Sequence, residues 1–160
     1  GRARATAFAG ALRTGLMAPR AHLCNGAILC DGADTYGAAP CRLPDGTAVL
    51  FAGFIGNRRA LRSELGELPP GDAALYAAAY PRWGTQADTR LHGEYAAVMV
   101  PPGGAPVRLV RSPIFAPALY YHHDGDRLIV ATTPAAFFAT GEIPRELDDH
   151  KISQGLPYSR

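Results

Sequence analysis

The stretch Leu91-His-Gly-Glu-Tyr-Ala-Ala-Val-Met-Val-Pro-Pro-Gly-Gly-Ala-Pro-Val-Arg-Leu-Val-Arg111 decides the fold. Its apolar and β-branched residues predict a strand over residues 94–100. Residues 101–106 carry the prolines and glycines that end a strand and reverse the chain. Residues 107–111 then predict a returning strand. The pattern therefore predicts an antiparallel hairpin as the centre of the fold.

Strand patterns continue on both sides of this hairpin. Residues 118–122 and 127–131 predict a second hairpin around an Asp-Gly turn. Upstream, residues 26–30 and 47–51 predict short strands, and we expect the second of these to end at Gly53. Tyrosines near these strands are expected to pack in the core or on the sheets; they are Tyr80, Tyr120 and Tyr121.

Two helices are predicted between the upstream strands and the central hairpin. Residues 58–65 place two leucines four positions apart on one helix face, and Gly66 follows as a stop signal. For a second helix over residues 73–83, Asp72 is a natural N-cap. Pro81 is expected to kink this helix or end it early, because proline has no N–H to donate.

The remaining segments complete the predicted architecture. Residues 31–45 are rich in Gly, Asp, Pro and Ala and predict a loop. Further helices are expected over residues 2–14, over residues 134–139 and from residue 147 onward. Strands in antiparallel pairs with separate helices predict an α+β fold. We expect residues 1–160 to form one domain.

Composition narrows the classes of function. The formal charge is only +2, from 16 basic and 14 acidic side chains, which does not favour a nucleic-acid partner. No apolar run approaches the roughly 18 residues needed to span a bilayer, and the sequence starts without a secretory signal pattern. We therefore expect a cytoplasmic protein that binds neither nucleic acid nor membrane. The arginine- and alanine-rich composition is typical of a GC-rich bacterial genome.

Three cysteines are expected to be reduced thiols, since their number is odd and no export signal accompanies them. With His22 they offer four potential zinc ligands, the cysteines being Cys24, Cys30 and Cys41. The sequence contains no close Cys-x-x-Cys pair that would preorganise such a site, so no metal is expected.

Four segments, in this order, resemble a known family: Phe51-Ala-Gly-Phe-Ile-Gly-Asn57, Gly71-Asp-Ala-Ala-Leu-Tyr-Ala-Ala-Ala-Tyr-Pro-Arg-Trp-Gly84, Leu91-His-Gly-Glu-Tyr-Ala-Ala97 and Leu109-Val-Arg-Ser-Pro-Ile-Phe-Ala-Pro-Ala-Leu-Tyr-Tyr121. They are similar to segments of the class II glutamine amidotransferase domain, which forms the N-terminal half of asparagine synthetases. The resemblance covers residues 26–156. It implies an Ntn-hydrolase-type four-layer αββα sandwich of two antiparallel sheets.

The resemblance also implies where a substrate pocket would lie. The first segment is similar to the family's Asn-Gly-Glu-Ile-Tyr-Asn, and Gly53 and Asn57 match it. Asp72 matches the family's Ser-Asp-Thr-Glu. These three residues are the candidates for a vestigial substrate-binding pocket. Ala52 and Phe54 stand where the family has Asn and Glu.

These departures remove chemistry that glutamine hydrolysis needs. The family uses a first-residue cysteine as nucleophile and its free amine as base, whereas residue 1 of this sequence is Gly1. The family's Asn helps hold the oxyanion of the tetrahedral intermediate, and Ala52 has no side-chain donor. The family's Glu contacts the amino group of the substrate, and Phe54 has no acceptor. We therefore expect no catalytic residue in this chain.

Degenerate domains of this kind occur in beta-lactam synthetases and in lasso-peptide macrolactam synthetases, and the sequence most resembles the latter. The resemblance implies a C-terminal synthetase domain of the same protein that uses ATP and magnesium, adenylates a side-chain carboxylate and closes an isopeptide ring. A precursor peptide, or the protein or protease that delivers or cleaves it, is a further expected partner. The alternatives are a beta-lactam-synthetase-like enzyme and an active glutamine-hydrolysing asparagine synthetase whose cysteine precedes the given sequence.

Overall fold

A computed structural model describes residues 20–24, 27–31, 40–125, 127–134, 138, 141, 143–144 and 146. The strands are β1 (Arg20–Cys24), β2 (Ala27–Asp31), β3 (Cys41–Arg42), β4 (Ala48–Ile55), β5 (Gly93–Val100), β6 (Arg108–Arg111), β7 (Tyr120–His123) and β8 (Leu128–Ala131). The helices are α2 (Arg58–Leu65), α3 (Asp72–Trp83) and α4 (Ala87–Arg90), with a 3-10 turn at Gly84–Gln86.

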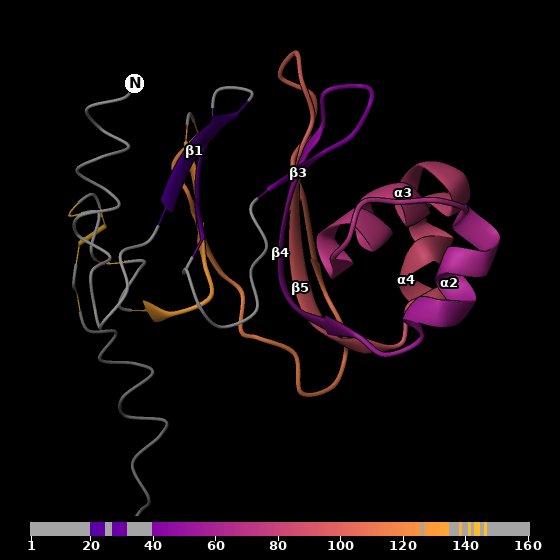
Figure 1. Ribbon diagram of the computed structural model, residues 1–160. Helices are drawn as coiled ribbons and strands as arrows, with labels where there is room; N and C mark the ends of the chain where they lie inside the picture. The colour runs from indigo at the N-terminus through magenta and orange to yellow at the C-terminus, as the bar shows by residue number, and fades with distance from the viewer. Residues whose placement is uncertain are drawn as a thin grey trace, which may run out of the picture.

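The centre of the fold is an antiparallel sheet with the strand order β3-β4-β5-β6. The predicted central hairpin is its β5–β6 pair, and β4 pairs with the other edge of β5. Helices α2, α3 and α4 cover one face of this sheet (Figure 1). Because strand side chains alternate between faces, every second residue of β4 and β5 points toward the helices.

The core lies between this sheet and α3. Its central feature is a group of three aromatic rings, Phe51 on β4, Tyr76 on α3 and Tyr95 on β5, with ring centroids 5.5 to 6.1 Å apart. Phe51 and Tyr95 stack with an interplanar angle of 18°. All three side chains are buried. This packing fixes α3, and therefore its first residue Asp72, against the sheet.

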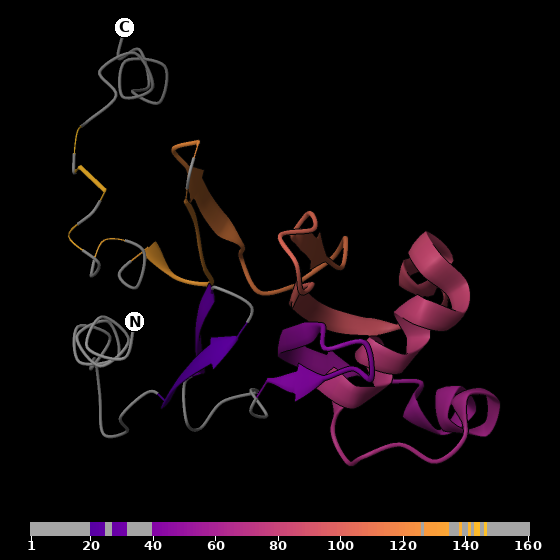
Figure 2. The same cartoon turned by 90° about the horizontal axis from the view of Figure 1, so that it is seen from above.

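The opposite face of the central sheet carries a second layer of strands. The hairpins β1–β2 and β7–β8 are both antiparallel, and they lie on the side away from the helices (Figures 1 and 2). Leu50, Ala52 and Val98 of the central sheet are half-buried on this face, as expected for an inner layer. The α+β class predicted from the sequence is confirmed. The predicted helices over residues 2–14 and from residue 147 lie outside the described residues.

The observed elements correct several boundaries. Strand β4 does not end at Gly53 but continues to Ile55, because the pairs Gly53 with Tyr95 and Ile55 with Gly93 are kept. Helix α3 does not end early at Pro81. Pro81 lies in the last turn of the helix, so it removes one N–H donor only, and the helix ends where the Gly84 N–H donates to the Tyr80 carbonyl.

Some features were not foreseen or were placed wrongly. β1, α4 and β3 were not predicted, and β3 lies inside the predicted loop over residues 31–45. Tyr80 packs against the core as expected, but Tyr120 and Tyr121 are exposed, Tyr121 to 67%. Hairpin β7–β8 leaves their rings outside the core.

Two sequence expectations concern membranes and metals. Among the described residues, no helix is both long enough and apolar enough to cross a bilayer. In the same part of the chain, no three His, Cys, Asp or Glu side chains gather as metal ligands would. Cys41 is a free, partly buried thiol, and its burial raises the pKa of that thiol.

Candidate functional site

The candidate site is an open hollow of about 530 Å³ where the end of β4 meets the first turns of α2 and α3. Its lining residues are Phe51, Gly53, Phe54, Arg58, Arg62, Gly71, Asp72 and Ala73. Two of the three predicted pocket residues, Gly53 and Asp72, therefore come together here. They are far apart in the sequence and meet because α3 packs on β4.

Gly53 shapes the floor of the hollow, and its position requires glycine. Its φ is +113°, in a region that L side chains rarely adopt. A Cβ at this position would lie 2.0 Å from the carbonyl oxygen of Glu94 and 2.7 Å from the Cα of Tyr95. The match of Gly53 to the family segment thus has a steric cause: β4 and β5 approach closely at this point.

The Asp72 carboxylate accepts three hydrogen bonds in the hollow. Its Oδ2 accepts a hydrogen bond from the Ile55 N–H at 3.0 Å, which ties the start of α3 to the end of β4. The Arg58 guanidinium donates from Nε to Oδ1 at 2.5 Å and from a terminal nitrogen to Oδ2 at 2.6 Å. This two-pronged pair is the geometry that arginine and carboxylate prefer. The hydrogen bond and the charge of Asp72 raise the pKa of Arg58.

The predicted N-cap role of Asp72 is wrong. Asp72 is the first residue of α3, and Gly71, with φ +107°, occupies the cap position without a side-chain hydrogen bond. The carboxylate instead turns toward β4 and Arg58. Arg58 was not among the candidates, because a sequence does not show that a residue at the start of one helix will pair with the start of the next.

The two sides of this ion pair differ in accessibility. The Asp72 side chain is 10% exposed and the Arg58 side chain is 55% exposed. A guanidinium has five N–H donors, and Asp72 engages two of them. Arg58 therefore presents positive charge at the mouth of the hollow while Asp72 lies beneath it.

Phe54 and Ala52 are the positions where the family carries polar groups. Phe54 lines the hollow and is 41% exposed, and its ring offers no hydrogen-bond acceptor. Ala52 lies next to Gly53 on the other face of β4, half-buried. This part of the hollow is thus apolar, and an amino group of a ligand would find no acceptor at Phe54.

Arg62 adds a second guanidinium to the hollow. It lies four residues after Arg58 on α2, so both side chains project from the same helix face. Arg62 donates to the carbonyl oxygens of Leu68 and Pro69, each at 3.2 Å, and so holds the loop between α2 and α3. The lining therefore contains two arginines and one aspartate.

Asn57 has a structural role beside the hollow and does not line it. Its Nδ2 donates to the Arg90 carbonyl at 2.8 Å, and its Oδ1 accepts from the His92 N–H at 3.0 Å. Both groups belong to the segment that enters β5. The amide thereby joins the β4–α2 connection to the start of the neighbouring strand, which explains its match to the family segment without a ligand.

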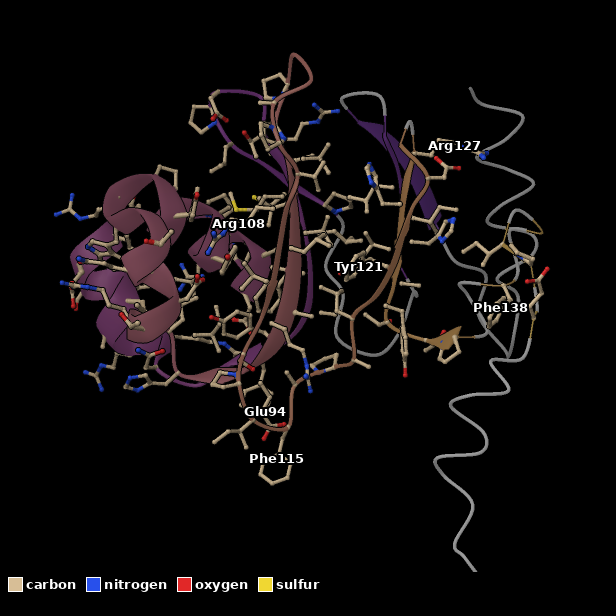
Figure 3. All side chains as sticks on the ribbon, turned by 180° about the vertical axis from the view of Figure 1, so that it is seen from behind. Glu94, Arg108, Phe115, Tyr121, Arg127 and Phe138 are labelled. Atoms are coloured by element: carbon tan, nitrogen blue, oxygen red, sulfur yellow. The ribbon has the colours of Figure 1, made fainter. Side chains whose placement is uncertain are left out.

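A further polar cluster lies between the helices and the sheet. Arg108 on β6 points toward the helices (Figure 3), where it pairs with Asp88 and its guanidinium lies 4.7 Å from the Tyr80 ring centroid. The Tyr76 hydroxyl donates to Asp88 at 3.2 Å. Burial raises the pKa of Tyr76, and burial together with the charge of Asp88 raises the pKa of Tyr95 to about 12. The cluster holds α3 and α4 on the sheet.

The loop after β6 is fixed by Arg111, the last residue of that strand. Its guanidinium donates to the carbonyl oxygens of Ala116 and Pro117, at 3.3 and 3.2 Å. Phe115 lies in this loop with φ +52° and is 84% exposed (Figure 3). Glycine would adopt that backbone conformation without strain.

The fold and the hollow define a class: an α+β sandwich of antiparallel sheets with a pocket at the end of a central strand. The family described as "Glutamine amidotransferase domain" matches residues 33–139, two-thirds of the chain, and the chain belongs to this family. Its fold is the Ntn-hydrolase-type sandwich predicted from the sequence. A comparison with curated proteins found no match.

Proposed function

We propose that this chain is a glutamine amidotransferase domain that no longer hydrolyses glutamine and that serves an amide-forming synthetase. One observation carries the proposal: the Asp72 carboxylate is occupied by Arg58 in the hollow where the family would hold its substrate. The substrate's ammonium group needs carboxylate or carbonyl acceptors. Asp72 already accepts three hydrogen bonds, and Phe54 provides none.

The neighbouring substitutions support the same conclusion. An oxyanion formed during amide hydrolysis is stabilised by preorganised donors, each worth about 3 kcal/mol. Gly53 has a positive φ, as its close approach to β5 requires. Ala52 has no side-chain donor that could stabilise an oxyanion. Gly53, Asn57 and Asp72 are therefore proposed as the remains of a substrate pocket: Gly53 and Asp72 still shape the hollow, while Asn57 supports it.

We place the chain in the asparagine synthetase type of enzyme, and within it closest to lasso-peptide macrolactam synthetases. In this proposal the C-terminal synthetase domain of the same protein binds ATP and magnesium and forms the amide bond with an amine of the substrate itself. Ammonia from glutamine is then not needed, which agrees with a hollow unsuited to glutamine. The chain described here packs on that domain and contacts the precursor peptide or the protein that delivers it.

The test uses the complete protein encoded by the natural reading frame. We expect no release of glutamate from L-glutamine, while pyrophosphate is released from ATP when a peptide with an acidic side chain is supplied. Glutamate release would contradict the proposal and favour an active amidotransferase. Pyrophosphate release with a beta-amino acid, but not with a peptide, would favour a beta-lactam-synthetase-like enzyme.

A further inference from the structure

We infer that the hollow at the end of β4 binds a carboxylate of a peptide. This inference rests on the proposed loss of glutamine hydrolysis and names a ligand class for the same hollow. Glutamine, the family's substrate, carries both an ammonium group and a carboxylate, and the guanidinium groups of Arg58 and Arg62 in this hollow suit only the carboxylate. Asp72 is the one acidic side chain of the lining, and it is neutralised by Arg58.

The arrangement of donors favours a carboxylate. Arg58 uses two of its five N–H groups for Asp72, and Arg62 uses one terminal nitrogen for each of two backbone carbonyls. Donors of both residues therefore remain for another acceptor. Because the two side chains are one helical turn apart on α2, one carboxylate can accept from both.

The shape of the hollow favours a side chain that belongs to a peptide. About 530 Å³ is more than a carboxylate alone needs, and the hollow is open to the surface. Gly53 and Gly71 have no side chains to fill it. Phe54, 41% exposed, offers an apolar surface for a residue next to the acidic one. The ligand is thus an acidic group of a peptide with an adjacent apolar side chain.

The chain offers a matched control for the charge of this helix. Arg59 lies between Arg58 and Arg62 in the sequence, is exposed and does not line the hollow. The variants Arg62→Gln and Arg59→Gln make the same change in net charge. Only Arg62→Gln removes a donor from the hollow. Comparing the two variants therefore separates binding at a specific site from general electrostatic attraction to the helix.

The experiment titrates capped Leu-Asp-Leu and capped Leu-Asn-Leu peptides into the full chain, followed by NMR chemical shifts. A third probe, Leu-Asn-Leu with a free C-terminal carboxylate, distinguishes a side-chain carboxylate from a chain end. We expect the aspartate peptide to bind with Kd of about 1 mM or lower, and we expect Arg62→Gln to raise this Kd about tenfold. Arg59→Gln should leave Kd within about twofold. Binding of the free-end peptide with the same dependence on Arg62 would support the site and identify the ligand as a chain end.

A second variant keeps the test decisive if Arg62→Gln disturbs the loop that Arg62 holds. The double variant Arg58→Gln, Asp72→Asn removes the ion pair and leaves the net charge of the lining unchanged. We expect this variant also to bind the aspartate peptide more weakly. Equal binding of the aspartate and asparagine peptides overturns the inference, as does no binding at about 10 mM or an equal loss in Arg59→Gln. Those results leave the proposed loss of hydrolysis standing, whereas turnover of L-glutamine would contradict that proposal itself.

Discussion

Two aspartate–arginine ion pairs in this molecule have different roles because their surroundings differ. Asp72 and Arg58 meet at the open hollow, where the arginine is 55% exposed. Asp88 and Arg108 meet between the helices and the sheet, where the side chains are only 30% and 26% exposed and Tyr76 and Tyr80 adjoin them. The first pair can accept a ligand at its open side. In the second pair both side chains are half-buried, and the pair serves to hold α3 and α4 in place.

The largest expected effect tests the backbone that forms the hollow. Gly53→Ala should lower the free energy of unfolding by about 4 kcal/mol, because the new Cβ meets backbone atoms that cannot move aside and the residue has a positive φ. Chemical denaturation measures the change. Gly104→Ala is the control: it has φ +75° but no atom within 4 Å of the new Cβ, so it should cost about 1 kcal/mol. Equal losses would mean that the close approach of β4 and β5 is unimportant.

Removing the half-buried carboxylate comes next in size. Asp88→Ala leaves the half-buried Arg108 without its charged partner and the Tyr76 hydroxyl without its acceptor, so we expect a loss of about 2 kcal/mol. Glu64→Ala removes the carboxylate of the exposed pair with Arg90 and should cost less than about 0.5 kcal/mol. Denaturation curves measure both losses. Equal losses of stability in the two variants would show that the half-buried pair contributes no more than the exposed pair.

Alkaline pH offers a measurement on the same region without removing its charges. The pKa of Tyr95 in the folded chain is about 12, above its ordinary value near 10, so the unfolded chain loses this proton first. The contribution of Tyr95 to stability should be constant below pH of about 10 and should fall by about 1 kcal/mol per pH unit between the two values. The variant Tyr95→Phe should make this decline less steep. An unchanged slope in that variant would show that Tyr95 does not cause the decline.

The smallest expected effect concerns the strained loop after β6. Phe115→Gly should raise the free energy of unfolding by about 0.5 kcal/mol, because glycine accepts φ +52° readily while it adds freedom to the unfolded chain. Phe115→Ala keeps the strain, and since the side chain is largely exposed we expect almost no change. A clear loss of stability in the alanine variant would show instead that the phenyl ring itself stabilises the fold.

The sequence predicted the parts of this molecule that depend on local patterns. The alternation in β5 and β6, the glycine and proline turn between them and the leucine spacing of α2 are all visible without a structure. β3 was not predicted, since a two-residue strand leaves no periodicity to detect. β4 extends past Gly53 because pairing with β5 outweighs the glycine signal.

The family segments named two residues of the hollow but not the contacts that they make. Gly53 and Asp72 both line it. The family segments could not show that Asp72 binds Arg58 instead of capping α3, because that choice depends on how α2 and α3 pack at the end of β4. Asn57 was a candidate both for the pocket and for turn geometry, and its amide binds the backbone that enters β5.

The central claim is that this hollow has lost the acceptors for an amino acid's ammonium group. Calorimetric titration of L-glutamine into the full chain and into the double variant Phe54→Glu, Arg58→Ala tests it most directly, since that variant restores one carboxylate and frees another. We predict no detectable binding to the unaltered chain and binding with Kd of about 1 mM or lower to the variant. Binding of glutamine to the unaltered chain as tight as to the variant would contradict the claim.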